Sequence, residues 1–312
     1  MKVTVVVPSI VGNEHYLKMS IESILKNKPY ELIIVVGNNE QLHKAKKILD
    51  NSKIKYIIQE RPNLNGARYT GALYAKGDII VYTDDDTIMS EGYIKNIIKF
   101  FEQNPDIDGI GGEIRTIKEN HEITCYGAKS AWIKERSITY LAGANMAYRK
   151  SVLTLPEVFD FDVQPSDDAQ IGLALTKLYK KKLKIIPGII IYHQKLELWR
   201  DIKQFIKYGV GKWKLIKWGL KHRILMNPVL YSPVILTGLL ILLVFIIIFK
   251  LWYLLFIFIL AEVWFLFTMF TNFKIQNKFT YISFIHIKQI LLLIGFYKGI
   301  WLDFKNFFKI LK

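Results

Sequence analysis

The chain of 312 residues contains a single cysteine, Cys125. An intrachain disulfide is therefore excluded, which is typical of proteins from reducing compartments. We expect Cys125 to be a small buried apolar residue rather than a nucleophile, because no reactive setting surrounds it in the sequence. The N-terminus also lacks the charged start, apolar stretch and cleavage site of a signal peptide, and the chain opens on the strand-like run Val3–Val7.

Acidic residues are scarce in the C-terminal part of the chain. Residues 195–312 contain 17 Lys and Arg but only 4 Asp and Glu, a net charge of +13, whereas residues 1–194 contain 26 and 23, a net charge of +3. Basic charge beside apolar segments suits an anionic membrane surface. A nucleic-acid-binding protein would place such charge on its folded domain. We therefore expect a membrane partner and no nucleic acid.

Charge of either sign is nearly missing from residues 229–271, where only Lys250 and Glu262 are charged. Segments 229–249 and 251–270 each have about the 20 residues that a helix needs to cross a bilayer. We predict a transmembrane hairpin. The hairpin predicts a multi-pass protein of the cell membrane. Because lysines crowd both flanks of the hairpin, the positive-inside rule predicts that the N-terminal domain is cytoplasmic.

The segments on either side of the hairpin are expected at the membrane surface. Residues 196–228 interleave Lys and Arg with aromatic residues such as Trp199 and Tyr208, a pattern typical of interfacial helices. An amphipathic helix packed on the N-terminal domain is the alternative. Residues 272–312 include an apolar stretch at 279–302, which we interpret as an interfacial or re-entrant helix, with a third span as the alternative.

Residues 1–195 alternate apolar runs with helical patterns. Runs such as Val3–Val7 and Leu32–Val36 predict strands buried on both faces of a parallel sheet. The intervening segments have apolar residues at helical spacing. Further strands are expected at 109–113, 141–148 and 185–193. The alternation predicts an α/β doubly wound domain, whose ligands bind beyond the carboxyl ends of the strands.

Three successive aspartates, Asp84, Asp85 and Asp86, follow the apolar run Ile79–Tyr82. Neighbouring carboxylates repel one another, and a hard divalent cation with oxygen ligands relieves that repulsion. Such a cation can also bridge a diphosphate and offset the charge on a leaving group. A solvated acidic turn is the alternative.

A second acidic pair, Asp167 and Asp168, precedes a helical pattern. Carboxylates at this place favour a helix N-terminus, and one of them can also serve as a general base if it reaches a substrate hydroxyl. The two roles can coexist, with Asp167 capping and Asp168 acting as the base. His193 ends a strand-like run and is either a metal ligand or a structural histidine.

Together these motifs resemble the family-2 glycosyltransferases, which have the GT-A fold. The resemblance covers about residues 1–200, and the segment 67–86 is its most specific part. It is carried by VTVVVPSI (3–10), LIIVVGNNE (32–40), ARYTGALYAKGDIIVYTDDD (67–86), GIGGEIR (109–115), LAGANMAYRKSVL (141–153) and PSDDAQIGLAL (165–175).

By position, the resemblance implies roles for particular residues. The nucleotide would be bound by Pro8, Ser9, Glu14, Asn38, Arg68, Asp84 and Asp85. The sugar pocket would be formed by Gly143, Ala144, Asn145 and Asp167. Mn²⁺ or Mg²⁺ would be held by Asp86, Asp84 and His193, and Asp168 would be the catalytic base. Asn38 stands where the family commonly has an aspartate, and its amide can still hydrogen-bond a base edge.

The resemblance implies a metal-dependent inverting transferase that moves a sugar from a nucleotide-diphosphate sugar to a hydroxyl of a lipid-linked acceptor at the cytoplasmic membrane face. A polyprenyl-phosphate sugar synthase is the alternative, but its phosphate acceptor needs no base, so the Asp167–Asp168 pair favours a hydroxyl. A catalytically silent membrane protein that binds nucleotides is a third hypothesis, disfavoured by the triple aspartate. The Gln-x-x-Arg-Trp motif of processive synthases does not occur, so we expect one sugar per encounter.

Overall fold

The structure is a computed structural model that describes residues 1–117, 123–124, 135–194, 198–224, 237–243, 289–303 and 305. The chain forms two compact units, Met1–Lys195 and Leu196–Lys312.

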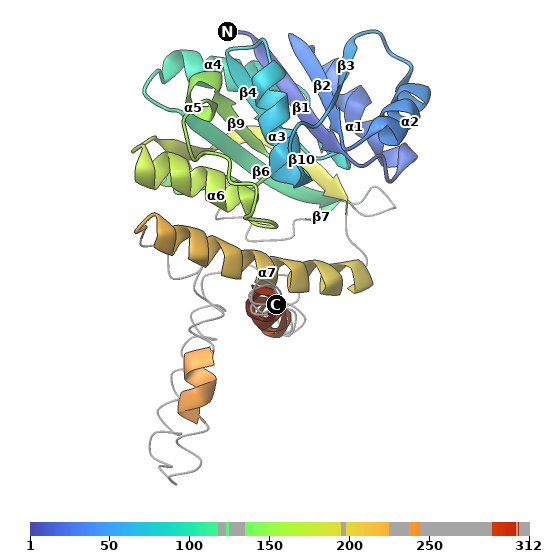
Figure 1. Cartoon of the computed structure of the whole chain (residues 1–312). Coiled ribbons are helices and arrows are strands. Elements are labelled where there is room, and N and C mark those ends of the chain that lie inside the picture. The colour runs from blue at the N-terminus through green and yellow to red at the C-terminus, as the bar shows by residue number, and fades with distance from the viewer. Residues whose placement is uncertain are drawn as a thin grey trace. The chain divides into compact units, whose positions relative to one another are not determined.

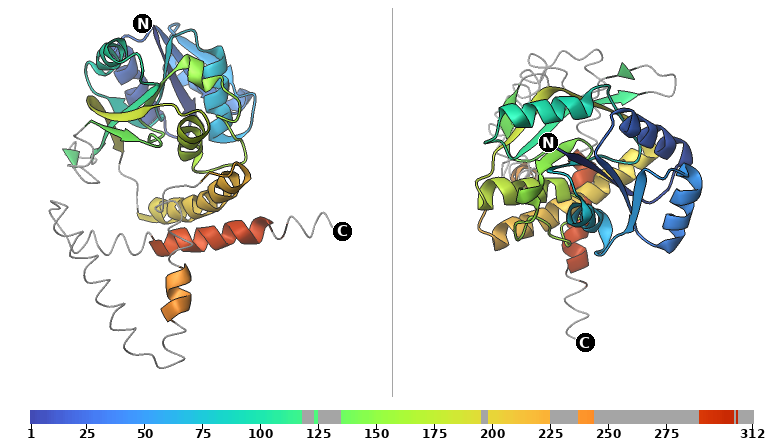
Figure 2. Two further views of the ribbon diagram at one scale, coloured as in Figure 1. Left: turned by 90° about the vertical axis from the view of Figure 1, so that its left-hand side faces the viewer. Right: turned by 90° about the horizontal axis from the view of Figure 1, so that it is seen from above.

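The first unit is built on one mixed sheet with helices on both of its faces (Figures 1 and 2). Its described strands are β1 (Val3–Ser9), β2 (Glu31–Val36), β3 (Ile54–Ile58), β4 (Ile79–Tyr82), β5 (Thr87–Met89), β6 (Gly109–Ile117), β7 (Ile123–Thr124), β8 (Arg136–Ile138), β9 (Met146–Arg149) and β10 (Leu183–Gln194). The main strand order is β3-β2-β1-β4-β9-β6-β10-β5, with β7 paired to β6 and β8 to β10. The helices are α1 (Glu14–Lys26), α2 (Asn39–Leu49), α3 (Asn63–Tyr74), α4 (Tyr93–Gln103), α5 (Lys150–Leu153) and α6 (Asp167–Leu173), which continues into the π-helical turn η1 (Ala174–Leu178).

The N-terminal half of the sheet is parallel, as the continuous apolar runs predict. Strands β1, β2, β3 and β4 pair in parallel, and every residue of β1 and β4 is buried. Because successive side chains of a strand alternate between faces, Val5 and Val7 join the core formed with α1, α2 and α4. Val6 faces the other way and lies against Gly71 of α3, where a Cβ would clash with it. This close approach explains the glycine.

The sheet is mixed rather than the doubly wound parallel sheet that the sequence predicts. Strand β9 is antiparallel to both of its neighbours, β4 and β6, and β5 is antiparallel to β10. Met146, the first residue of β9, pairs with Tyr82, the last residue of β4. The segment before β9 therefore lies at the edge of the sheet where β4 ends, and a strand entering from that edge has to run antiparallel.

The predicted strand at 141–148 is correspondingly shorter in the structure and begins only at Met146. Asn145, just before it, is 1% exposed. Its amide nitrogen donates to the Glu113 carbonyl at 3.0 Å, and its amide oxygen accepts from the Tyr93 hydroxyl at 2.6 Å. These contacts hold 141–145 as a loop despite its apolar composition. Helix α4 and the short strand β5 were not among the predicted elements.

The second unit contains α7 (Leu198–Lys221) and a helix at 289–303 that crosses it. At the crossing Gly209 and Gly295 let the backbones meet, since a Cβ on either would clash with the backbone of the other helix. Trp213 packs edge-on against Phe296 with ring centroids 5.4 Å apart. Its indole nitrogen donates to Asp303 at 2.9 Å, and Lys217 pairs with the same carboxylate at 2.6 Å.

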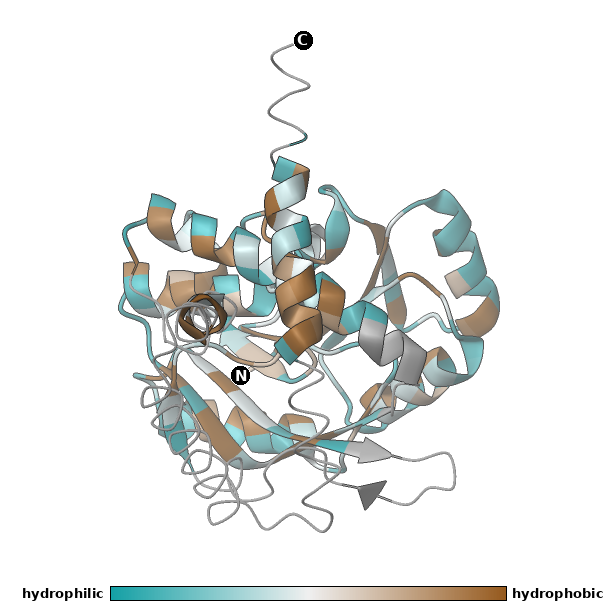
Figure 3. Cartoon of the chain, turned by 90° about the horizontal axis from the view of Figure 1, so that it is seen from below, coloured by the Kyte–Doolittle hydropathy of each residue, from teal (hydrophilic) through white to brown (hydrophobic). Residues whose placement is uncertain are grey.

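Within the described part of the chain, no helix is both long enough and apolar enough to span a bilayer. Most of the hairpin predicted over 229–271 lies outside the described residues, which include only the helical stretch 237–243. The helix at 289–303 is most hydrophobic near its N-terminal end, at residues 290–294, and becomes more hydrophilic toward its C-terminal end (Figure 3).

Candidate active site

The loop that leaves β4 carries the triple aspartate, and two threonines fix its backbone. The hydroxyls of Thr83 and Thr87 lie 2.6 Å apart. Thr87 donates to the carbonyl of Asp84 at 2.8 Å, and Ser20 of α1 donates to the same carbonyl at 3.3 Å. Thr83 also donates to the Ala144 carbonyl at 3.0 Å, which ties this loop to the loop before β9. The aspartates are therefore presented on a rigid turn.

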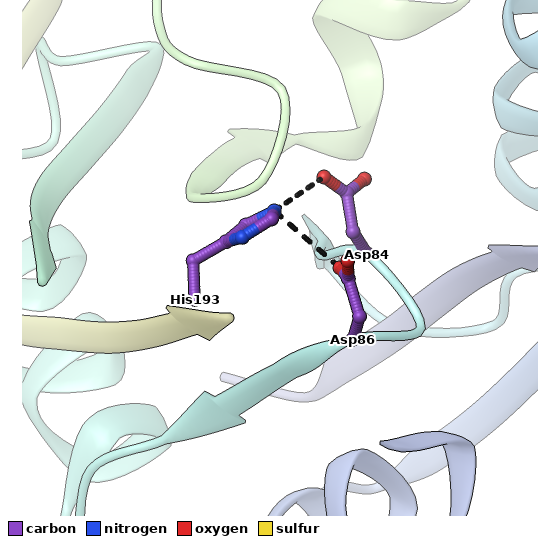
Figure 4. A group of neighbouring side chains, drawn as sticks. All are labelled: Asp84, Asp86 and His193. Carbon is purple, nitrogen blue, oxygen red and sulfur yellow. Dashed lines mark ion pairs between the residues drawn. The ribbon is translucent and has the colours of Figure 1, made fainter. Parts of the chain in front are cut away.

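Asp84, Asp86 and His193 point toward one another from two separate parts of the chain (Figure 4). His193 comes from β10, which β5 brings alongside through the pairing of His193 with Thr87. The Nε2 atom of His193 lies 3.4 Å from Asp86 and 3.9 Å from Asp84. One ligand atom from each residue lies within 4.8 Å of the others, close to twice a metal–ligand bond of about 2.1–2.2 Å. The three side chains fit one divalent cation.

Asp85, the middle aspartate, points to β1 instead. The hydroxyl of Ser9 donates to its carboxylate at 2.5 Å and accepts from the backbone N–H of Val11 at 2.9 Å. Burial raises the pKa of Asp85 to about 6, opposed by the Ser9 hydrogen bond and reinforced by the charges of Asp86 and Asp84. Asp85 thus ties the acidic loop to the end of β1.

Arg68 of α3 lies behind the acidic loop and is 2% exposed. Its Nη1 atom forms an ion pair with Asp167 at the start of α6, whose side chain is 6% exposed. Its Nη2 atom lies 3.9 Å from Asp84. The backbone carbonyl of Arg68 accepts from the buried hydroxyl of Tyr82 at 3.0 Å. One buried cation therefore lies between a carboxylate of the candidate metal site and a carboxylate of the second acidic pair.

Asp168, next to Asp167, is half-buried and accepts two backbone hydrogen bonds. Gly143 donates to its Oδ2 at 3.1 Å and Ala169 donates to its Oδ1 at 2.8 Å. Ser166, before the helix, makes no side-chain capping bond. Asp168 therefore contributes to capping α6, whereas Asp167 pairs with Arg68; the sequence reading had suggested Asp167 for the cap. The capping role thus falls to Asp168 rather than to Asp167, and the general-base role of Asp168 stays a prediction.

The structure places the other predicted nucleotide residues along the same edge of the sheet. Pro8 is buried in β1. Asn38 is exposed just beyond β2, where its side-chain oxygen caps α2 by accepting from Gln41 at 2.9 Å. Glu14 is exposed at the start of α1, and a hydrogen bond from Lys18 lowers the pKa of its carboxyl. Their contacts with a nucleotide stay predictions.

The predicted sugar-pocket residues differ in what their side chains can reach. Gly143 lies between Arg68 and Asp168, and a Cβ there would be 2.6 Å from Nη2 of Arg68. Ala144 contributes its carbonyl to Thr83. The buried amide of Asn145 is satisfied by contacts within the protein. Asn145 therefore supports the loop from within the protein, and contacts of these residues with a sugar stay predictions.

Sequence reasoning missed the hydroxyl groups that hold the acidic loop. Thr83 and Thr87 flank the triple aspartate directly, so their adjacency was a usable signal. Ser20 lies 64 residues away from its partner Asp84, and no pattern in the sequence relates the two. The same holds for Tyr93, which supports Asn145.

The mixed sheet and the acidic cluster at the strand ends define a GT-A domain, and comparisons with known proteins agree. The family model described as "Glycosyl transferase family 2" matches residues 4–155. This match covers just under half of the chain, and it makes residues 4–155 similar to the enzymes of that family. A solved structure of GalNAc-T7 with UDP, GalNAc and Mn²⁺ is similar in fold, with a TM-score of 0.50 and 18% identity over 63% of this chain and 44% of that chain.

Two archaeal relatives are similar in sequence. The glucosyl-dolichyl phosphate glucuronosyltransferase of Haloferax volcanii is 31% identical over 121 residues, which are 36% of this chain and 38% of that protein. The dolichyl N-acetyl-alpha-D-glucosaminyl phosphate 3-beta-D-2,3-diacetamido-2,3-dideoxy-beta-D-glucuronosyltransferase of Methanococcus voltae is 24% identical over 267 residues, 77% of this chain and 83% of that protein. The match to the first relative thus spans well under half of its length.

Proposed function

We propose that this protein transfers a sugar from a nucleotide-diphosphate sugar to a hydroxyl group of a lipid-linked acceptor, with inversion at the anomeric carbon. The observation that carries the proposal is the convergence of Asp84, Asp86 and His193 at the strand ends. A second acidic pair, Asp167 and Asp168, is joined to this cluster through Arg68. Two acidic groups with separate environments are what a metal-dependent transfer to a hydroxyl requires.

In this proposal Asp168 is the base. It accepts the proton of the acceptor hydroxyl, the hydroxyl oxygen forms a bond to the anomeric carbon, and the bond from that carbon to the diphosphate oxygen breaks. The nucleoside diphosphate leaves with the electron pair of the broken bond. A bound divalent cation supplies charge neutralisation of the diphosphate. The backbone N–H of Gly143, 3.1 Å from Asp168, orients the carboxylate.

The donor set favours Mn²⁺ over Mg²⁺ as the resident cation. Mg²⁺ prefers oxygen ligands and keeps several waters, whereas imidazole is a ligand for transition-metal ions, a class that includes Mn²⁺. A cluster of two carboxylates and the Nε2 atom of His193 suits Mn²⁺, which accepts both ligand types.

A lipid-linked acceptor is supported by the names of both archaeal relatives, which contain a dolichyl phosphate. The second unit adds a physical reason. The helix at 289–303 exposes four apolar side chains on one face, at spacings of four, three and four residues: Ile290, Ile294, Tyr297 and Trp301. Such a contiguous apolar face typically marks an interaction or membrane surface. With the +13 charge of residues 195–312, it favours attachment to an anionic membrane, with the enzyme domain on the cytoplasmic side.

The proposed activity is tested with purified full-length protein and a panel of labelled nucleotide sugars. Each donor is assayed with native lipid extract, with and without Mn²⁺. We expect one donor to give Mn²⁺-dependent transfer of label to lipid, and Asp86→Asn to lose that transfer. Inactivity of the wild-type protein with every donor would contradict the proposal and favour a nucleotide-binding role without catalysis.

The acceptor class is tested by Asp168→Asn. A hydroxyl must lose its proton during attack, whereas a phosphate acceptor is already anionic. We expect this isosteric change to lower turnover by about 10²- to 10⁴-fold, the usual contribution of a general base, while the melting-temperature shift caused by the active donor stays unchanged. Wild-type turnover in the variant would indicate a polyprenyl-phosphate acceptor instead.

A further inference from the structure

The ion pair between Arg68 and Asp167 is placed where it can control the candidate metal site, although neither residue belongs to the metal cluster. The guanidinium of Arg68 has two acidic neighbours, Asp167 on one side and Asp84 on the other. It contacts Asp167 directly, but its nearest approach to Asp84 is 3.9 Å, at the outer limit of an ion pair. The cation is therefore shared unequally between the two carboxylates.

This unequal sharing matters because the carboxylate of Asp84 cannot bind both the Arg68 guanidinium and a metal ion closely. A carboxylate that pairs closely with a guanidinium accepts its N–H groups in a bidentate fork. Such a fork occupies the oxygens that a metal ion would use. In the structure one oxygen of Asp84 faces Arg68 and the other faces His193. The metal-facing oxygen stays available only while Arg68 remains on its far side.

Burial leaves Arg68 with few alternatives to these two partners. Its side chain is 3% exposed, so solvent cannot compensate the charge if Asp167 is neutralised. A Cβ at position 143 would lie 2.6 Å from Nη2, so the loop also confines the guanidinium from that direction. Without the Asp167 charge, electrostatics would draw the guanidinium toward Asp84.

We propose that Asp167 is a positioning residue that holds the guanidinium of Arg68 away from Asp84 and so keeps Asp84 available as a metal ligand. The inference rests on the proposed metal-dependent function and assigns Asp167 a part in it that needs no contact with sugar or metal. Asp167 acts only through Arg68. Its removal should therefore be reversed by removing the arginine as well.

The test measures Mn²⁺ binding to the purified full-length chain from the electron paramagnetic resonance signal of free Mn²⁺. Asp167→Asn should weaken Mn²⁺ binding by roughly five- to tenfold, within the range of coupling between neighbouring charged groups. The double variant Arg68→Met/Asp167→Asn removes both charges and should restore the affinity to near the wild-type value. Asp162→Asn is the matched control, because Asp162 is an exposed aspartate in the loop before α6 and its loss should leave the affinity unchanged.

The outcomes separate the inference from the proposed function. If Asp167→Asn binds Mn²⁺ as the wild-type protein does, the inference is wrong while the metal site stands. If the double variant stays as weak as the single one, Arg68 does not mediate the effect and the inference is also wrong. If the wild-type chain binds no Mn²⁺, the proposed metal-dependent function fails and the inference fails with it. Thermal unfolding of each variant identifies a loss of affinity that is due only to misfolding.

Discussion

Gly143 has no side chain, yet it takes part in two contacts of the candidate site. Its N–H orients Asp168, and the absent Cβ leaves room for the Arg68 guanidinium. A methyl group there would sit 2.6 Å from Nη2 of Arg68, so the guanidinium, the loop or both must move. Both contacts are therefore sensitive to a shift of less than an ångström.

We expect Gly143→Ala to lower turnover by at least about tenfold, because small misplacements of catalytic groups are costly. The free energy of unfolding should fall by about 1–3 kcal/mol from overpacking. Steady-state kinetics and denaturant unfolding measure the two effects. Gly12→Ala is the control, since its added Cβ would meet no atom closer than 3.7 Å. Equal activity of both variants would show that the loop adapts without cost.

At the scale of elements, the sequence is most informative where structure is local. The runs at β1, β2 and β4 are continuous and apolar because both faces of those strands are buried, and this pattern alone predicts parallel strands. The polar residues that follow these strands could be placed at one edge of the sheet for the same reason.

The second half of the domain was less predictable because its elements depend on distant contacts. The position of β9 is set by its neighbours in the sheet, and the apolar loop before it is held by the amide of Asn145. The Arg68–Asp167 pair joins residues that no periodicity relates. The short strand β5 follows an acidic turn and is too brief to produce a pattern.

The crossing of α7 with the helix at 289–303 depends on two glycines, which gives a prediction at the same scale. Gly209→Leu should force the helices apart, because its side chain would enter the backbone around Leu292 and Gly295. We expect faster amide hydrogen exchange in residues 198–221, consistent with a loss of about 1–3 kcal/mol. Gly238→Leu provides the control, since a Cβ there meets nothing within 4 Å. Unchanged exchange in Gly209→Leu would argue against this packing.

At the scale of the whole molecule, charge and exposed apolar surface both concentrate in the second unit. Trp301 is 64% exposed at the end of the apolar face of the helix at 289–303. Burying such a side chain in a membrane interface contributes about 1.5–3 kcal/mol. Residues 1–194, by contrast, have a net charge of only +3.

Trp301→Asp should therefore reduce binding of the full chain to phosphatidylglycerol vesicles by about tenfold or more. Vesicle co-sedimentation at two salt concentrations measures this, and salt should weaken binding of both proteins because the charge contribution is screened. Leu73→Asp, at a 51% exposed position of the first unit, is the matched control and should bind as the wild type does. If only the Leu73 variant lost vesicle binding, the membrane surface would lie on the first unit and the prediction would be wrong.

The nitrogen atom of His193 beside the two carboxylates of the candidate metal site has a practical consequence. A mixed set of one imidazole and two carboxylates should also accept cobalt(II), an ion close to Mn²⁺ in the affinity series but bound more tightly. Cobalt(II) absorbs visible light according to its coordination number. Cobalt(II) bound at this site would thus be an optical reporter. Binding of a donor could then be followed as a change in the visible absorption spectrum, without a labelled sugar.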